Sequence, residues 1–119
     1  MYELSPEEQE KNKAYQFYRL AEYLNEMPVI QVMADNIEAD DVIAVLCRSD
    51  HYAGRSKIIV SSDKDFFQLC DNETRIYRPI QDTITTEASI VDDFGIHPNN
   101  FALARAVAGD ASDNISGVP

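Results

Sequence analysis

Short runs of β-branched and other apolar residues alternate with helix-like segments along this 119-residue chain. The runs are too short for helices and are typical of buried strands; they cover residues 29–33, 57–61 and 74–80, with a brief fourth strand from 82–83. Capping signals and helical spacing of apolar residues predict helices over residues 5–27, 38–48, 65–70, 87–94 and 99–108. This alternation predicts one α/β domain over residues 1–119, with a mostly parallel central sheet and helices on both faces.

The charge balance limits the function classes. Twenty-one acidic residues against 10 basic ones give a net charge of -11, which argues against binding DNA through a broad basic surface. This argument against DNA binding weakens if several carboxylates converge on a divalent ion, because the ion makes the local electrostatic field positive. No apolar segment approaches the length of a membrane span, and acidic sequence follows Met1, so we expect a cytoplasmic protein. Cys47 and Cys70 lie in apolar surroundings and are expected to be reduced thiols.

Three acidic clusters follow predicted elements: "NIEADD" at 36–41, "SSDKD" at 61–65 and "GDASDN" at 109–114. In open α/β sheets, binding sites form beyond the carboxyl ends of the strands. Each cluster alone is explained structurally, as acids at a helix start, a helix cap or a turn, and for a single cluster we favour that explanation. The carboxylates concerned are Glu38, Asp40, Asp41, Asp63, Asp65, Asp110 and Asp113.

The three clusters together favour a metal site. Glu38 and Asp41 are three apart on a predicted helix and share a face. Asp63 and Asp65 are two apart at a strand end, where period-two geometry predicts the same side. Oxygen-only ligands at such spacings suit Mg²⁺ or Mn²⁺. Two such ions about 4 Å apart can hold the attacking water and the leaving oxygen of a phosphodiester.

The segments "IEADDVIAVL", "IIVSSDKDFFQL" and "AVAGDASDNISGVP" resemble, in order and spacing, the metal-binding motifs of the 5′-nuclease family. That family includes the 5′-3′ exonuclease domain of bacterial DNA polymerase I, flap endonucleases and phage RNase H type enzymes. The resemblance covers roughly residues 29–119. It implies a PIN-like three-layer α/β fold in which all seven carboxylates match motif positions. Lys64 becomes a candidate phosphate contact, although a solvated surface lysine is the favoured alternative.

The resemblance also implies a function. The family uses divalent metals to cut DNA or RNA–DNA at a 5′ end or flap, as in primer or flap removal during replication. We therefore expect a monomeric enzyme acting with two Mg²⁺ or Mn²⁺ ions in a bacterial cell or a phage-infected host. One alternative is a truncated, non-catalytic module that binds metal or a partner. A second alternative is a PIN-type ribonuclease, but the segment "GDASDNISGVP" argues against it.

The chain departs from the family pattern at both ends. The family has a first strand that supplies another metal-ligating aspartate, and no strand is predicted before Ser5. Lys11 and Lys13 could be remnants of the basic helical arch, but a solvated helix face explains them equally well. After "SDNISGVP" the family continues into a helix-hairpin-helix element that binds the DNA backbone. We therefore expect an incomplete nuclease domain with weak or no activity by itself.

Overall fold

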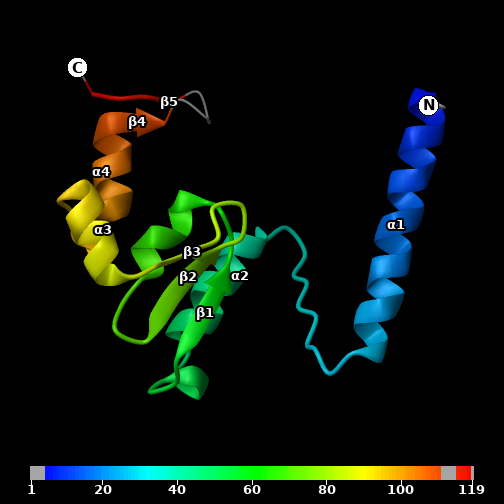
Figure 1. Cartoon of the computed structure of the whole chain (residues 1–119), viewed down its shortest axis with the longest axis horizontal. Coiled ribbons are helices and arrows are strands. Elements are labelled where there is room, and N and C mark those ends of the chain that lie inside the picture. Colours follow the sequence, from blue (N-terminus) through cyan, green and yellow to red (C-terminus); the bar gives the residue numbers. More distant parts are fainter. Residues whose placement is uncertain (1–4, 111–114, 119) are drawn as a thin grey trace. The chain divides into compact units, whose positions relative to one another are not determined.

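The first helix forms where its capping signals predict it. The computed structural model describes residues 5–110 and 115–118, and the chain divides into two compact units, Met1–Met33 and Ala34–Pro119. In the first unit, α1 spans Pro6–Glu26 (Figure 1). The Ser5 hydroxyl accepts a hydrogen bond from the Glu8 N–H at 3.3 Å, and the Glu8 carboxylate accepts one from the Ser5 N–H at 2.8 Å. This capping box satisfies two backbone donors that have no partner within the helix, so the predicted helix is confirmed.

The strand predicted over residues 29–33 is wrong. These residues adopt no regular structure, and Figure 1 shows them as an irregular segment after α1. The side chains of Ile30 and Met33 are 86% and 92% exposed. A β-branched sequence favours a strand only where a pleated, half-buried surface receives it, and the described part of this unit, residues 5–33, offers none.

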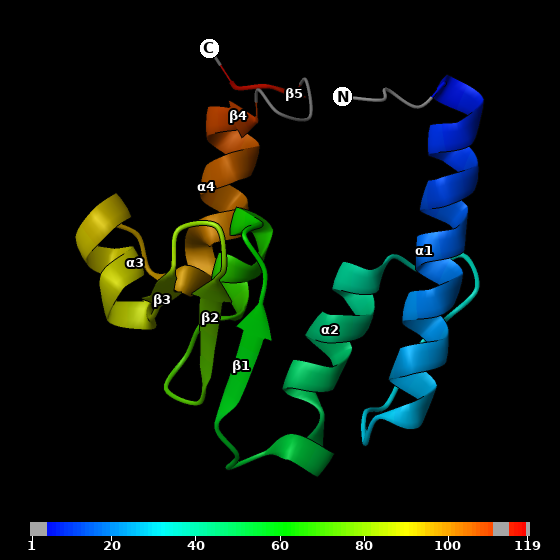
Figure 2. The ribbon, with the colours of Figure 1, turned by 45° about the vertical axis from the view of Figure 1, so that its right-hand side comes forward.

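The central sheet lies in the second unit and is mixed. Strand β1 spans Lys57–Val60 and pairs in parallel with β2, Thr74–Arg78. Strand β3, Thr83–Thr85, pairs antiparallel with β2 (Figure 2). The strands thus lie close to their predicted places. The expectation of a mostly parallel sheet is not met, because residues 79–82 form too short a connection for a parallel crossover and the chain turns back as a hairpin.

The remaining elements follow the predicted order. The α-helices are α2, Ala39–Arg48, α3, Glu87–Phe94, and α4, Phe101–Ala108. The 3₁₀ helices are η1, Asp50–Tyr52, η2, Lys64–Leu69, and η3, Pro98–Asn100. Two short strands, β4, Gly109–Asp110, and β5, Ile115–Ser116, pair beyond the last predicted helix. Gly95 ends α3 with φ 67°, a left-handed conformation that glycine adopts without steric cost.

The core of this unit is centred on η2. This element contacts α2, α4, η3 and β2. Its buried apolar residues pack with others from β1, β2, α3 and α4; the core comprises Ile59, Phe66, Phe67, Leu69, Cys70, Ile76, Ile90 and Phe101. Alternation along β1 buries Ile59 and leaves Ile58 and Val60 exposed. Within this unit the helices therefore pack against one face of the sheet, not both as expected.

Both cysteines are free, as expected. Cys47 is half-buried and Cys70 is buried, and burial raises the pKa of the Cys70 thiol to about 11. A thiol with this pKa stays protonated at neutral pH and behaves as a small apolar side chain. Among the described residues, no helix combines the length and apolar composition needed to cross a bilayer.

Candidate active site

The first acidic cluster begins α2. Glu38 is the N-cap residue with an extended backbone, but its side chain makes no capping hydrogen bond. Asp40 and Asp41 follow in the first turn and are exposed. Their charges interact favourably with the helix dipole, as the structural explanation requires. Since none of the three carboxylates caps a backbone N–H of α2, they are not committed to the helix by hydrogen bonding.

The second cluster begins η2. Strand β1 ends at Val60, so Asp63 and Asp65 do not share the period-two strand geometry predicted for them. Asp63 is instead the N-cap of η2, and its Oδ1 accepts a hydrogen bond from the Asp65 N–H at 2.9 Å. The Asp65 carboxylate forms an ion pair with the Arg105 guanidinium of α4, Oδ1 to Nη1 2.5 Å. The two carboxylates of this cluster therefore have different partners.

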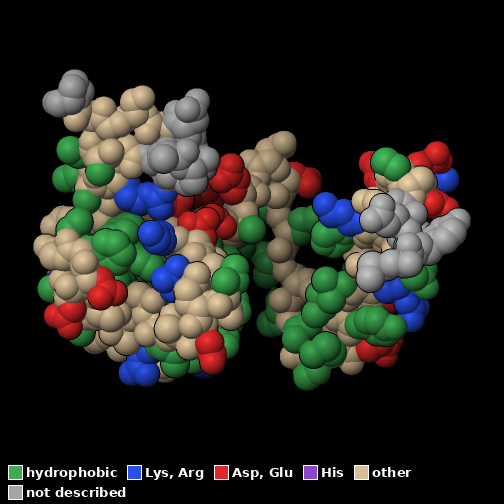
Figure 3. All heavy atoms as spheres, turned by 45° about the horizontal axis from the view of Figure 1, so that its top comes forward, with side chains coloured by type: hydrophobic (Ala, Val, Ile, Leu, Met, Phe, Trp, Pro, Cys, Tyr) green, Lys and Arg blue, Asp and Glu red, His purple; other side chains and the backbone are tan. Residues whose placement is uncertain are grey.

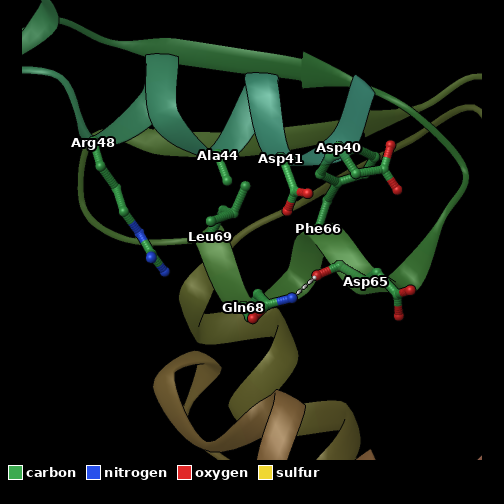
Figure 4. Close-up of a pocket in the computed structure, with 8 residues that line it drawn as sticks. All are labelled: Asp40, Asp41, Ala44, Arg48, Asp65, Phe66, Gln68 and Leu69. Atoms are coloured by element: carbon green, nitrogen blue, oxygen red, sulfur yellow. Dashed lines mark hydrogen bonds between the residues drawn. The ribbon is translucent and has the colours of Figure 1, made fainter. Parts of the chain in front are cut away.

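Acids from the first two clusters meet at one pocket of about 200 Å³. Its lining comes from α2 and η2 and consists of Asp40, Asp41, Ala44, Arg48, Asp65, Phe66, Gln68 and Leu69. Figure 4 shows the Asp41 carboxylate directed between the two helices and the Arg48 side chain reaching from the far end of α2. The Gln68 side chain donates a hydrogen bond to the Asp65 backbone oxygen at 2.9 Å, which fixes the turn below the pocket. Glu38 and Asp63 do not line this pocket.

The third cluster follows α4. Asp110 lies in β4, where its backbone pairs with Ile115. Its side chain, and Asp113 as a whole, lie outside the described residues, so their part in the site stays a prediction. Gly109 has φ 83°, and a Cβ there would lie 2.3 Å from the Gly117 nitrogen. Only glycine allows this backbone approach, which explains the two glycines that flank the cluster.

The donor chemistry of the pocket fits a hard divalent cation. Carboxylate oxygens are the ligands that Mg²⁺ and Mn²⁺ prefer, and Asp40, Asp41 and Asp65 supply them at one pocket. Within residues 5–110 and 115–118, no three carboxylate, imidazole or thiol side chains are close enough together to hold an ion by themselves. At Asp65 the positive partner is the Arg105 guanidinium.

Two arginines of the site were missed from the sequence. Arg48 lines the pocket with the carboxylates, and helical spacing could have predicted this. Ala44 and Arg48 follow Asp41 by three and seven residues, which places all three on one face of α2. Arg105 is 40 positions from Asp65. No local pattern relates these two residues, because the packing of α4 against η2 brings them together.

A sheet covered on one face by short helices, with carboxylates gathered where α2 and η2 begin, defines a PIN-like α/β domain. Comparison with known proteins gives the same answer. Residues 2–95 match the family of the 5′-3′ exonuclease N-terminal resolvase-like domain. The chain belongs to this family.

Relatives and a solved structure agree with the assignment. A 5′-3′ exonuclease of Buchnera aphidicola subsp. Schizaphis graminum is 37% identical over 109 residues, covering 91% of this chain and 38% of the relative. The thermostable DNA polymerase I of Thermus filiformis is 33% identical over 90 residues, which cover 76% of this chain and 11% of the polymerase. The structure of the bacteriophage T5 D15 flap endonuclease, in a pseudo-enzyme-product complex with DNA and metal ions, matches with a TM-score of 0.77 and 18% identity. The match covers 98% of this chain and 43% of the endonuclease. This likeness confirms the PIN-like fold, and the chain spans less than two fifths of the Buchnera exonuclease.

Proposed function

We propose that this chain carries the acidic active site of a divalent-metal-dependent 5′-nuclease, which hydrolyses phosphodiesters of DNA or RNA–DNA at a 5′ end or flap. The observation that carries the proposal is the meeting of Asp40 and Asp41 with Asp65 at one pocket. These residues come from two sequence segments, and each segment is explained separately by helix capping or the helix dipole. Like charges that converge disfavour one another unless cations neutralise them. The Arg105 guanidinium pairs with Asp65, and a shared divalent cation would neutralise Asp40 and Asp41 as well.

Each acidic residue has a proposed role. Asp40, Asp41 and Asp65 hold Mg²⁺ or Mn²⁺ at the pocket, in a site of two ions. Glu38, Asp63, Asp110 and Asp113 complete the site, either directly or through water. The bound ions supply Lewis-acid stabilisation of charge on the phosphate and a water of lowered pKa. Asp63 also fixes the turn that carries Asp65, since its carboxylate accepts the Asp65 N–H.

A non-catalytic module of the same fold is the second candidate. The observation that favours it is the ion pair between Asp65 and Arg105, together with the lack of a ready three-ligand group in the described part of the chain. A protein of this kind would bind a metal or a partner without cutting a phosphodiester. Metal binding measured beside cleavage separates the two candidates.

A substrate panel tests the proposed activity. We expect the chain, in excess over substrate and with Mn²⁺, to cut a 5′-labelled flap duplex slowly near the junction and to leave single-stranded RNA intact. EDTA should stop the cutting, because the carboxylates cannot stabilise charge on phosphate without a cation. The products are followed on a denaturing gel. Preferential cutting of single-stranded RNA would instead favour a PIN-type ribonuclease.

A further inference from the structure

Two cationic side chains, Lys64 and Arg78, lie on one cluster of phenylalanine rings. The Lys64 ammonium is 6.0 Å from the ring centroid of Phe94, and the Arg78 guanidinium carbon is 5.6 Å from that of Phe67. The two rings are themselves neighbours, with centroids 5.9 Å apart. The contacts between cations and ring faces hold both side chains in place at the surface of the core.

Neither cation is paired with a carboxylate among residues 5–110 and 115–118. Lys11, Arg19, Lys57 and Arg105 each form an ion pair with an acidic side chain. Lys64 and Arg78 form none in the same part of the chain, and the Arg78 Nε is buried without a hydrogen-bond partner. Lys64 is exposed and Arg78 is half-buried, so both side chains are partly open to an anion from outside.

The pair lies at the same edge of the sheet as the acids. Arg78 ends β2 directly after Tyr77, which is in register with Val60, the last residue of β1. Lys64 lies between Asp63 and Asp65 at the start of η2, and η2 contacts β2. Figure 3 shows Lys and Arg side chains gathered beside Asp and Glu side chains and a hydrophobic patch on one face of this unit.

We propose that Lys64 and Arg78 bind the phosphate backbone of single-stranded nucleic acid next to the acidic pocket. The proposal rests on the proposed function for the identity of the anion, a strand that continues from the phosphodiester at the carboxylates. Lys64 and Arg78 lie over neighbouring rings and can each contact a phosphate, and the Phe94 ring under Lys64 is 41% exposed and can contact a base. Positive charge combined with an accessible aromatic ring is the chemistry that proteins use for single strands.

Salt-dependent binding tests this pair. Binding of a 5′-fluorescein-labelled twelve-residue oligothymidylate to the full chain is measured by anisotropy at several KCl concentrations, in EDTA so that no metal-dependent cleavage occurs. The slope of log K against log salt is negative, and each lost phosphate contact reduces its magnitude by about 0.7 for single strands. Lys64→Gln with Arg78→Gln should therefore reduce the magnitude by about 1.4. Lys64→Gln alone changes an exposed residue and should reduce it by about 0.7.

A charge-matched control variant separates this pair from general electrostatics. Arg75 lies on the same strand as Arg78 but on the opposite face, and Arg55 lies in the loop before β1; both are exposed. Arg55→Gln with Arg75→Gln removes the same charge and should leave the slope unchanged. Because Arg78 covers a core ring, the thermal unfolding of each variant is measured by circular dichroism to show that it is folded. Arg78→Lys keeps the positive charge and should keep the parental slope.

The outcomes are distinct. A parent chain that does not bind the oligonucleotide, or a Lys64 and Arg78 variant with the parental slope, overturns the proposal. An equal loss of slope in the Arg55 and Arg75 variant also overturns it. A further outcome is that the Lys64 and Arg78 variant shows the predicted loss of slope while the parent chain fails to cleave the flap duplex. That combination refutes the proposed nuclease activity and leaves the phosphate contact standing, since no metal is present when binding is measured.

Discussion

The Asp63→Asn, Asp65→Asn variant is expected to cleave a labelled 5′-flap duplex about 100-fold more slowly than the parent chain, since one electrostatic contact to a transition state contributes about that much. Asparagine keeps the size of the side chain and is as good an N-cap as aspartate, so η2 should still form. What the substitutions remove is two negative charges beside the pocket. Single-turnover rates with Mg²⁺ and with Mn²⁺ measure the effect.

A matched variant controls for net charge. Asp92 and Asp93 are exposed on α3 and line no part of the pocket. Changing both to asparagine removes the same charge and should leave the rate within about twofold of the parent, as for surface changes away from a site. The ion pair between Asp65 and Arg105 is partly exposed and contributes about 0–1 kcal/mol, so a large loss of rate will not reflect unfolding. Equal rates for parent and site variant would show that the site is wrongly placed.

Phe67→Ala is expected to lower the free energy of unfolding by about 3–5 kcal/mol, the usual cost of removing a fully buried phenylalanine. Phe67 is 1% exposed and packs against Phe94 and Phe101 at centroid distances of 5.9 and 5.2 Å. Its loss leaves a cavity under η2, the element that carries Asp65. Since domains of this size are stable by about 5–15 kcal/mol, the substitution removes from about a fifth to all of that stability.

Phe94→Ala provides the comparison. This ring belongs to the same cluster but is 41% exposed, so less apolar surface returns to water when it is removed. The midpoint of urea unfolding should fall clearly further for Phe67→Ala than for Phe94→Ala. Equal midpoints would mean that η2 does not lie at the centre of the core.

The sequence predicted most elements through short-range chemistry. The capping box of Ser5 and Glu8 and the apolar run of β1 depend on neighbours a few residues away, and both elements formed where expected. The strand over residues 29–33 failed because a strand needs a partner, and β-branched residues cannot show whether one exists. The mixed sheet was missed because the short connection between β2 and β3, not the strand sequences, sets their direction.

The candidate site was predicted in part. Asp65 follows β1, as the rule that sites form beyond strand ends predicts. Asp40 and Asp41 follow no strand, because residues 29–33 form none, and the packing of α2 against η2 brings them to the same pocket. The relation between Asp63 and Asp65 was wrong because β1 ends before them and a 3₁₀ turn begins. The contact between Arg105 and Asp65 depends on how α4 packs on η2, which no residue spacing encodes.

Calorimetric titration with Mn²⁺ tests the metal site most directly. We predict that the parent chain binds Mn²⁺ and that the Asp63→Asn, Asp65→Asn variant binds it at least about tenfold more weakly, while the Asp92→Asn, Asp93→Asn variant binds it like the parent. Binding by the parent without cleavage of any substrate would favour the non-catalytic module. No binding by the parent, or equal affinity in the parent and the site variant, would contradict the assignment of these carboxylates to a metal.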